Sequence, residues 1–176
     1  GAVTAMKWVA TAACLCLLLG SGMFYSNTKV DSVVSLDINP SIELTVSKND
    51  KVLSAVALNK DAEIVLDGMD LKKVDLDIAL NAIIGSLLKN GYLDEVYNAI
   101  NVCVENDDTK RADEISALIK SEISSIMAEK DLIGDVNSQS CPMDEALKEL
   151  AEKYGVSVGK FMLAQKVSEN VDISLE

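Results

Sequence analysis

The hydrophobic and polar positions of this chain form one long uncharged run, which a series of shorter patterns follows. Residues 8–28, between Lys7 and Lys29, carry no charge. This length is close to the roughly 20 residues that a helix needs to cross a bilayer. Trp8 at one end and Phe24-Tyr25 at the other are side chains that favour membrane interfaces. The run therefore predicts a single transmembrane helix.

Two alternatives for the uncharged run fit less well. In a signal peptide Trp8–Leu19 would be the apolar core, but no convincing small-residue cleavage site follows it. A buried helix of a soluble protein would not need so complete an absence of charge. We therefore divide the chain into a membrane helix with its flanks, residues 1–28, and a second domain, residues 29–176. Because the sequence opens with Gly1, we also expect a segment upstream of it.

The second domain begins with a strict alternation of apolar and polar residues, which is typical of half-buried strands. The apolar members are all even-numbered: Val34, Leu36, Ile38, Ile42, Leu44 and Val46. If the two runs pair as a hairpin, this parity places Ile38 opposite Ile42 with Asn39-Pro40-Ser41 as the loop. The alternative is one long strand that bends at Pro40. In both cases the Asn-Pro bond lies where the strand ladder is interrupted.

The rest of the chain mixes strand-like and helix-like patterns. The predicted strands are 52–58, 63–66 and 99–104. The predicted helices are 76–88, a long one that Asp108 or Thr109 caps, 143–154, and 158–167 capped by Ser157. The fold class is therefore α+β: an N-terminal transmembrane helix, then a small sheet packed against several helices.

Charge and composition exclude several functions. The net charge is -12, and an acidic surface repels phosphate backbones, so we expect no nucleic-acid partner. The sequence contains no histidine, which excludes histidine-based acid–base catalysis and histidine-ligated zinc. The acidic clusters match no calcium-loop spacing. We therefore predict no metal and no cofactor, and any chemistry must use carboxylates, amides, hydroxyls, thiols or the backbone.

The four cysteines fall into two pairs. Cys14 and Cys16 lie in the uncharged run, where they are interpreted as small hydrophobic residues in preference to lipidation sites. Cys103 belongs to a predicted strand, and Cys141 to a predicted loop before Pro142. In an oxidising compartment these two could form a disulfide, but the sequence does not establish that they lie close together.

The segment Gly155–Lys160, with the sequence GVSVGK, superficially resembles a phosphate-binding loop. It is one residue short between the glycines, and Phe161 stands where serine or threonine is required. The helices on either side of it also resemble a DNA-binding helix-turn-helix, which the acidic surroundings disfavour. We therefore interpret the segment as a turn between two packing helices.

The Asn39-Pro40 pair is the candidate site for chemistry. The Asn39 side-chain amide could attack its own backbone carbonyl, close a succinimide and expel the nitrogen of Pro40. A twisted, strained peptide bond held in attack geometry would lower the barrier. Asp37 and Glu43 are the nearest candidate proton acceptors. In a rival route, Ser41 attacks the Pro40 carbonyl and cuts one bond later.

A purely structural interpretation of the pair is also open. Proline has no N–H to give to a sheet, so it often ends one strand and opens another at edges and bends. In that case the protein is an uncleaved, membrane-tethered interaction domain in which Pro40 is a strand break. On residue chemistry alone, this interpretation is the stronger one.

The sequence around the pair, Asp37-Ile38-Asn39-Pro40-Ser41-Ile42-Glu43 just beyond a membrane helix, resembles the extracytoplasmic domain of RsgI-type transmembrane anti-sigma factors of Gram-positive bacteria. The resemblance covers roughly residues 6–170. It implies autoproteolysis between Asn39 and Pro40, a single turnover rather than a repeating reaction, and thus favours self-cleavage over the strand break.

The resemblance also implies location and partners. The protein would be a single-pass protein of the cell membrane, held by residues 8–28, with its C-terminal domain extracytoplasmic. A cytoplasmic segment outside this sequence would bind the cognate sigma factor, and a distal module would sense polysaccharide. An intramembrane protease would act on the short stub, residues 26–39, that cleavage leaves on the membrane helix.

Overall fold

The computed structural model describes residues 28–173, with side chains up to Ser168. The predicted membrane helix, residues 8–28, lies outside the described residues except for Thr28. Within residues 28–173 no helix is long and apolar enough to cross a membrane.

The described residues contain one five-stranded mixed sheet in the order β3-β2-β1-β4-β5. Its strands are β1 (Val30–Asp37), β2 (Ser41–Ser47), β3 (Val52–Ala57), β4 (Asn98–Glu105) and β5 (Gly134–Cys141). All neighbours are antiparallel except β4 and β5, which are parallel. The first strand of the domain is therefore the central strand of the sheet.

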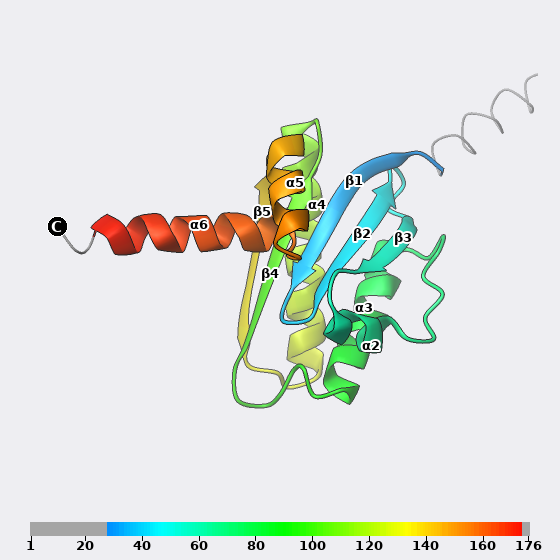
Figure 1. Ribbon diagram of the computed structural model, residues 1–176. Helices are drawn as coiled ribbons and strands as arrows, with labels where there is room; N and C mark the ends of the chain where they lie inside the picture. The colour runs from blue at the N-terminus through cyan, green and yellow to red at the C-terminus, as the bar shows by residue number, and fades with distance from the viewer. Residues whose placement is uncertain (1–27, 174–176) are drawn as a thin grey trace, which may run out of the picture.

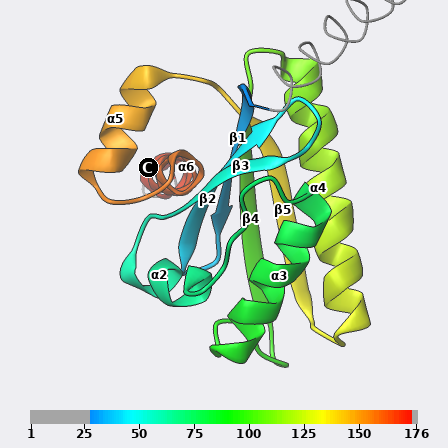
Figure 2. The same cartoon turned by 90° about the vertical axis from the view of Figure 1, so that its right-hand side faces the viewer.

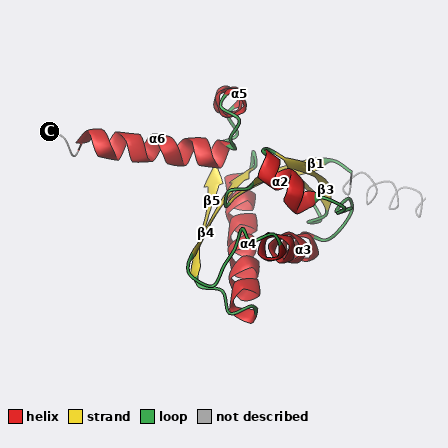
Figure 3. Ribbon diagram, turned by 60° about the horizontal axis from the view of Figure 1, so that its bottom comes forward, coloured by secondary structure: helices red, strands yellow, loops and turns green. Residues whose placement is uncertain are grey.

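Helices cover both faces of this sheet. They are α2 (Lys60–Leu66), α3 (Leu76–Lys89), α4 (Thr109–Glu129), α5 (Glu145–Lys153) and α6 (Val158–Ile173). Helices α3 and α4 pack on one face, and α5 and the start of α6 lie on the other (Figures 1 and 2). Figure 3 shows the same layers, with α6 leaving the body of the domain beyond its first turns.

Strand alternation explains why the two faces differ. Even-numbered apolar residues from Val34 onward in β1 and in β2 and β4, among them Leu36, Ile42 and Val102, form one buried cluster with residues of α3 and α4. The odd-numbered residues of the same strands face α5 and α6, and many are polar and buried, such as Asp37 and Glu105. The hydrophobic core therefore lies on the α3–α4 side, and the second face is a buried polar surface.

The α+β class and most elements are confirmed. The structure forms the β1–β2 hairpin rather than one bent strand, but the predicted register is wrong by two residues. Leu36 lies opposite Ile42, and Asp37 opposite Ser41, so the loop is Ile38-Asn39-Pro40. Both registers keep the even-numbered apolar residues on one face of the sheet. In the observed register Ile38 belongs to the loop and therefore lies outside the ladder.

Three smaller expectations are corrected. Residues 63–66 are not a strand but the end of α2, because the side chain of Asn59 caps a helix there by accepting from the backbone N–H of Ala62. Strand β5 was not predicted, since its residues are almost all polar. Cys141 consequently ends a strand instead of lying in a loop. The Asp108 cap of the long helix is confirmed.

Candidate functional site

The candidate site is the loop at the end of the central strand. Asp37 and Ser41 form the last pair of the β1–β2 ladder, and Asp37 also lies opposite Asn101 of β4. The backbone N–H of Ile38 donates to the carbonyl of Pro40 over 2.9 Å, which closes the loop. Asn39 is exposed at the tip, whereas Pro40 is buried. The Asn-Pro peptide bond thus joins a residue whose side chain is accessible to solvent to a proline that is buried.

Asn39 has a strained backbone. Its φ is +91°, in a region that residues with side chains rarely occupy, although asparagine occupies it more readily than most. The following proline restricts Asn39 further, because its ring crowds the preceding residue and favours extended conformations with negative φ. Such a conformation costs about 1–3 kcal/mol and persists only where the surroundings enforce it.

The residues after the loop are held in place on the β3 side. The backbone N–H of Leu58 donates to the carbonyl of Ser41 over 3.0 Å. The side-chain oxygen of Asn59 accepts from the backbone N–H of Ser41 at 3.4 Å while it caps α2. Ser41 is therefore bound on both sides, by Asp37 of β1 and by the Leu58-Asn59 segment.

Asp37 is a buried carboxylate directly before the loop, with an exposed fraction of 4%. Its Oδ2 accepts from the hydroxyl of Ser157 at the start of α6, and Oδ1 has no hydrogen-bond partner. Burial raises the pKa of Asp37, whereas hydrogen bonds from Ser157 and Ser41 and the charge of Lys160 act in the opposite direction. The group is thus a carboxyl with one free oxygen, as a proton acceptor or donor requires.

Glu43 lies apart from the loop, two residues further along β2. It is half-buried and close enough to Glu105 of β4 to raise the pKa of that residue. Burial is the main cause of the shift, which brings the pKa of Glu105 to about 7; Lys148 of α5 opposes the shift and Glu145 adds to it. The structure therefore brings together Asp37, Ser41 and the Asn39-Pro40 bond, and places Glu43 in a second acidic group under α5.

A disulfide lies beside the site. Cys103 of β4 and Cys141 of β5 are bonded, with 5.7 Å between their Cα atoms. Cys103 stands on the same face as Asp37, beneath the first turn of α6. This bond joins β4 to β5 on the polar face of the sheet, against which the first turn of α6 packs.

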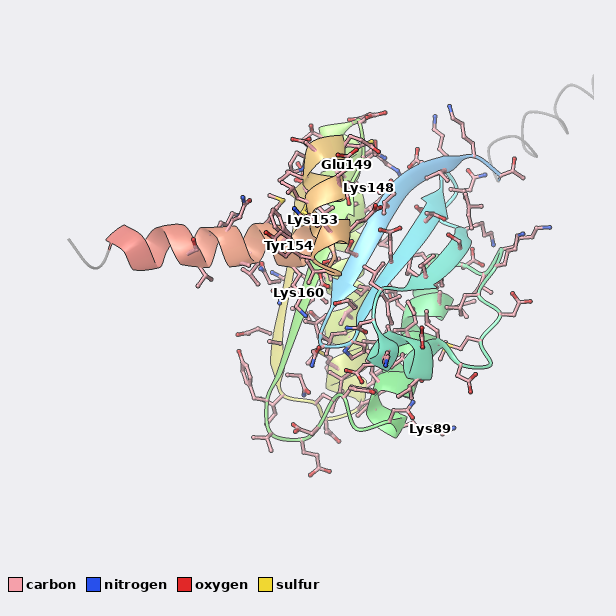
Figure 4. The ribbon with its side chains drawn as sticks, in the orientation of Figure 1. Lys89, Lys148, Glu149, Lys153, Tyr154 and Lys160 are labelled. Atoms are coloured by element: carbon pink, nitrogen blue, oxygen red, sulfur yellow. A yellow bond between two sulfur atoms is a disulfide. The ribbon has the colours of Figure 1, made fainter. Side chains whose placement is uncertain are left out.

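Sequence reasoning missed the contribution of α6 to the site. The segment Gly155–Lys160 is a turn between two helices, as predicted, but it also places Ser157 on Asp37 and Gly159 against Cys103. Figure 4 shows Tyr154, which follows α5, and Lys160, at the start of α6, on this side of the sheet. The small residues of the segment were the signal, since small residues permit a close approach of backbones.

Within the part of the chain that the structure describes, no group of three or more cysteine or carboxylate side chains could hold a metal. The chemistry available at the loop is that of an amide, two hydroxyls and a buried carboxyl. Fold and site together define a class of protein: a disulfide-braced α+β domain whose central strand ends in a strained Asn-Pro loop.

Comparison with known proteins assigns the family. The family model described as the anti-sigma factor RsgI-like central domain matches residues 31–166. The chain belongs to this family.

Individual relatives agree with the assignment. The chain is 27% identical to the anti-sigma-I factor RsgI7 of Acetivibrio thermocellus over 169 residues, which cover 94% of the chain and 31% of that protein. It is 31% identical to RsgI2 of the same organism over 173 residues, 96% of the chain and 25% of that protein. The similarity to RsgI of Bacillus subtilis is 23% over 143 residues, 78% of the chain and 35% of that protein. The chain thus spans about a third or less of these relatives.

Proposed function

We propose that this domain cleaves its own chain once, between Asn39 and Pro40, and keeps its two fragments associated. It would do so within a membrane-anchored anti-sigma factor that relays an extracellular signal, from a polysaccharide, toward intramembrane proteolysis and release of the sigma factor. The observation that carries the proposal is the φ of +91° at Asn39, directly before Pro40 and between two anchored strand ends.

The cleavage step balances without a cofactor. The Asn39 side-chain nitrogen bonds to the Asn39 backbone carbon and closes a succinimide, while the bond from that carbon to the Pro40 nitrogen breaks. One proton leaves the amide nitrogen and one arrives at the Pro40 nitrogen. Asp37, two residues away and with a free oxygen, is the group best placed to mediate this exchange. Water later opens the succinimide.

Retention of the fragments follows from the position of β1. The N-terminal fragment would hold its place as the central strand, paired with β2 on one side and β4 on the other. Its Val34 and Leu36 have exposed fractions of 0% and 1%, whereas Ile38 is only partly buried. Burial of two such side chains contributes about 3–6 kcal/mol.

Polar contacts near the start of β1 add to retention. The side-chain amide of Asn106 donates to the carbonyl of Asp31 and to the hydroxyl of Ser32. Arg111 pairs with the carboxylate of Asp31 at 3.2 Å and with that of Asp50 at 2.6 Å. These bonds tie the predicted stub to α4 and to the β2–β3 turn.

The membrane location and the partners rest on family membership and two supporting features. The uncharged residues 8–28 suit a membrane helix. The disulfide suits an oxidising, extracytoplasmic compartment. The sigma factor, the intramembrane protease and the polysaccharide signal belong to the proposal for the whole protein.

The test is the mass of the purified chain under denaturing conditions. We expect two fragments, the second beginning with Pro40. While the succinimide survives, the first fragment should be lighter by one water than a fragment that ends in a free Asn39 carboxylate. A second fragment that begins with Ser41 would instead indicate attack by the Ser41 hydroxyl, for which the nearby Asp37 carboxyl could accept the proton. A single unbroken chain after prolonged incubation would favour the uncleaved interaction domain.

A further inference from the structure

The hydroxyl of Ser157 has two structural functions. It donates to the carboxylate of Asp37, and it accepts from the backbone N–H of Lys160 over 3.0 Å. The carbonyl of Ser157 also accepts from the backbone N–H of Phe161 at 3.0 Å, in the first turn of α6. Ser157 therefore caps the helix and binds Asp37 with the same atom, so the seating of α6 and the environment of Asp37 are coupled.

Gly159 fixes how closely α6 approaches the sheet. A Cβ atom at this position would lie 2.6 Å from the Cβ of Cys103 and 3.4 Å from Oδ2 of Asp37. Only glycine permits this contact without displacement of the helix. Ser157 and Val158 beside it are buried, whereas Leu163 and Val167 further along α6 are 37% and 55% exposed. The helix is thus attached to the sheet mainly by its first turn.

Asp37 in turn braces the cleavage loop. Its backbone pairs with Ser41 across the hairpin, and the Ser41 hydroxyl lies near enough to its carboxylate to lower the pKa of that group. These contacts fix the distance between the two ends of the loop, which is what keeps Asn39 in its strained conformation. Loss of the contact from Ser157 would free the carboxylate to rotate and would loosen this brace.

We infer that Ser157 and Gly159 of α6 are positioning residues that act through Asp37 on the Asn39-Pro40 bond, so that cleavage requires α6 to be seated on the sheet. The inference rests on the proposed self-cleavage and adds its regulation. Anything that lifts the first turn of α6 before cleavage would leave the chain uncut. Ser157 lies 120 positions from Asp37 in the sequence.

The polar surroundings of Asp37 predict how the cleavage rate depends on pH. From α6 it faces Ser157 and the charge of Lys160, and from β2 the hydroxyl of Ser41. A small cavity beside it is lined by the neutral side chains of Asn101, Asn137 and Gln139; Glu43 and Glu105 lie further along the same face. Because the Ser157 hydrogen bond favours the ionised carboxylate, its removal raises the pKa of Asp37 further.

The experiment uses the full chain, made in a cell-free reaction with lipid nanodiscs under oxidising conditions. A brief pulse of labelled amino acid is followed by samples on denaturing gels at several pH values. Ser157→Ala removes the hydrogen bond, and Ser157→Thr retains a hydroxyl. Ser116→Ala is the matched control, because Ser116 is also a buried serine that bonds another side chain, Ser138, but on the opposite face of the sheet.

We expect the cleavage rate of Ser157→Ala to be about one tenth of that of the unaltered chain, or lower. The midpoint of its cleavage rate as a function of pH should shift upward. Ser157→Thr should restore both, and Ser116→Ala should change neither, even if it lowers stability equally. Gly159→Val should slow cleavage as well, since its side chain cannot fit against Cys103. Cleavage of Ser157→Ala at the rate and midpoint of the unaltered chain would overturn the inference and leave self-cleavage intact. If the unaltered chain does not cleave, self-cleavage fails and the inference fails with it.

Discussion

The hydroxyl of Ser157 binds the carboxylate of Asp37, which joins the start of the C-terminal helix to the residue two positions before Asn39. This contact connects the end of the domain to the loop that follows its first strand.

Asn39→Gly should abolish cleavage while leaving the fold intact. Glycine has no amide nucleophile, and it adopts positive φ without strain, so the free energy of unfolding should rise by up to about 1 kcal/mol. Asn39→Ala should also remain uncut but should be less stable, since alanine does not tolerate that φ. Mass spectrometry and denaturant unfolding check both. Continued cleavage of either variant would exclude the succinimide route.

Leu36→Ala should weaken the association of the cleaved fragments. Leu36 is 1% exposed in the central strand, and its truncation typically costs about 2–5 kcal/mol. We expect the fragments to separate on size-exclusion chromatography at lower denaturant concentrations than in the unaltered domain. Val30→Ala, at a position 48% exposed on the same strand, is the control and should change little.

Arg111→Ala should loosen the start of β1. The change removes the contacts to Asp31 and Asp50, and these groups are only partly exposed, so about 1–2 kcal/mol of stability should be lost. Lys110→Ala is the neighbouring control, because its pair with Glu114 is long and exposed. Thermal unfolding of both variants measures the difference, and equal losses would show that the Arg111 contacts contribute nothing specific.

Glu105 should make the domain less stable as pH rises from about 4.5 to about 7. Its pKa is about 7 in the folded domain against 4.5 for the unperturbed group, so the folded state binds the proton more tightly. Its contribution is fully present below pH 4.5 and is lost as pH rises through about 7, up to about 3 kcal/mol. Glu105→Gln should remove this slope and stabilise the domain at pH 8. Glu149→Gln, on the exposed side of α5, should retain it.

Reduction of the Cys103–Cys141 disulfide should destabilise the domain by about 3–4 kcal/mol, because the bond closes a loop with a sequence separation of 38 and restricts the unfolded chain. Unfolding with and without a reducing agent measures the loss. A Cys103→Ser, Cys141→Ser double variant should match the reduced protein and should not respond to the reductant. A response of that variant would show that the agent acts elsewhere.

Local patterns identified most of the elements, and their failures have clear physical causes. The alternation in residues 34–46 predicts two strands because one face of each is buried, but parity alone leaves the register open by two residues. Residues 63–66 form a helix because Asn59 caps it, and so short an apolar run does not distinguish strand from helix. Strand β5 has no apolar alternation: Val136 packs against the core, while Ser138 meets α4 through hydrogen bonds with Ser116.

The sequence by itself determined the α+β class, the place of the Asn-Pro bond at a break in the strands, and the absence of histidine chemistry, because these depend on composition and on neighbours along the chain. Only the tertiary structure decided that β1 is the central strand, that Cys103 meets Cys141, and that Ser157 lies on Asp37. Each of these three features depends on contacts between residues that are far apart in the chain. They form because the helices must bury both faces of the sheet, and no local pattern encodes which distant residues then meet.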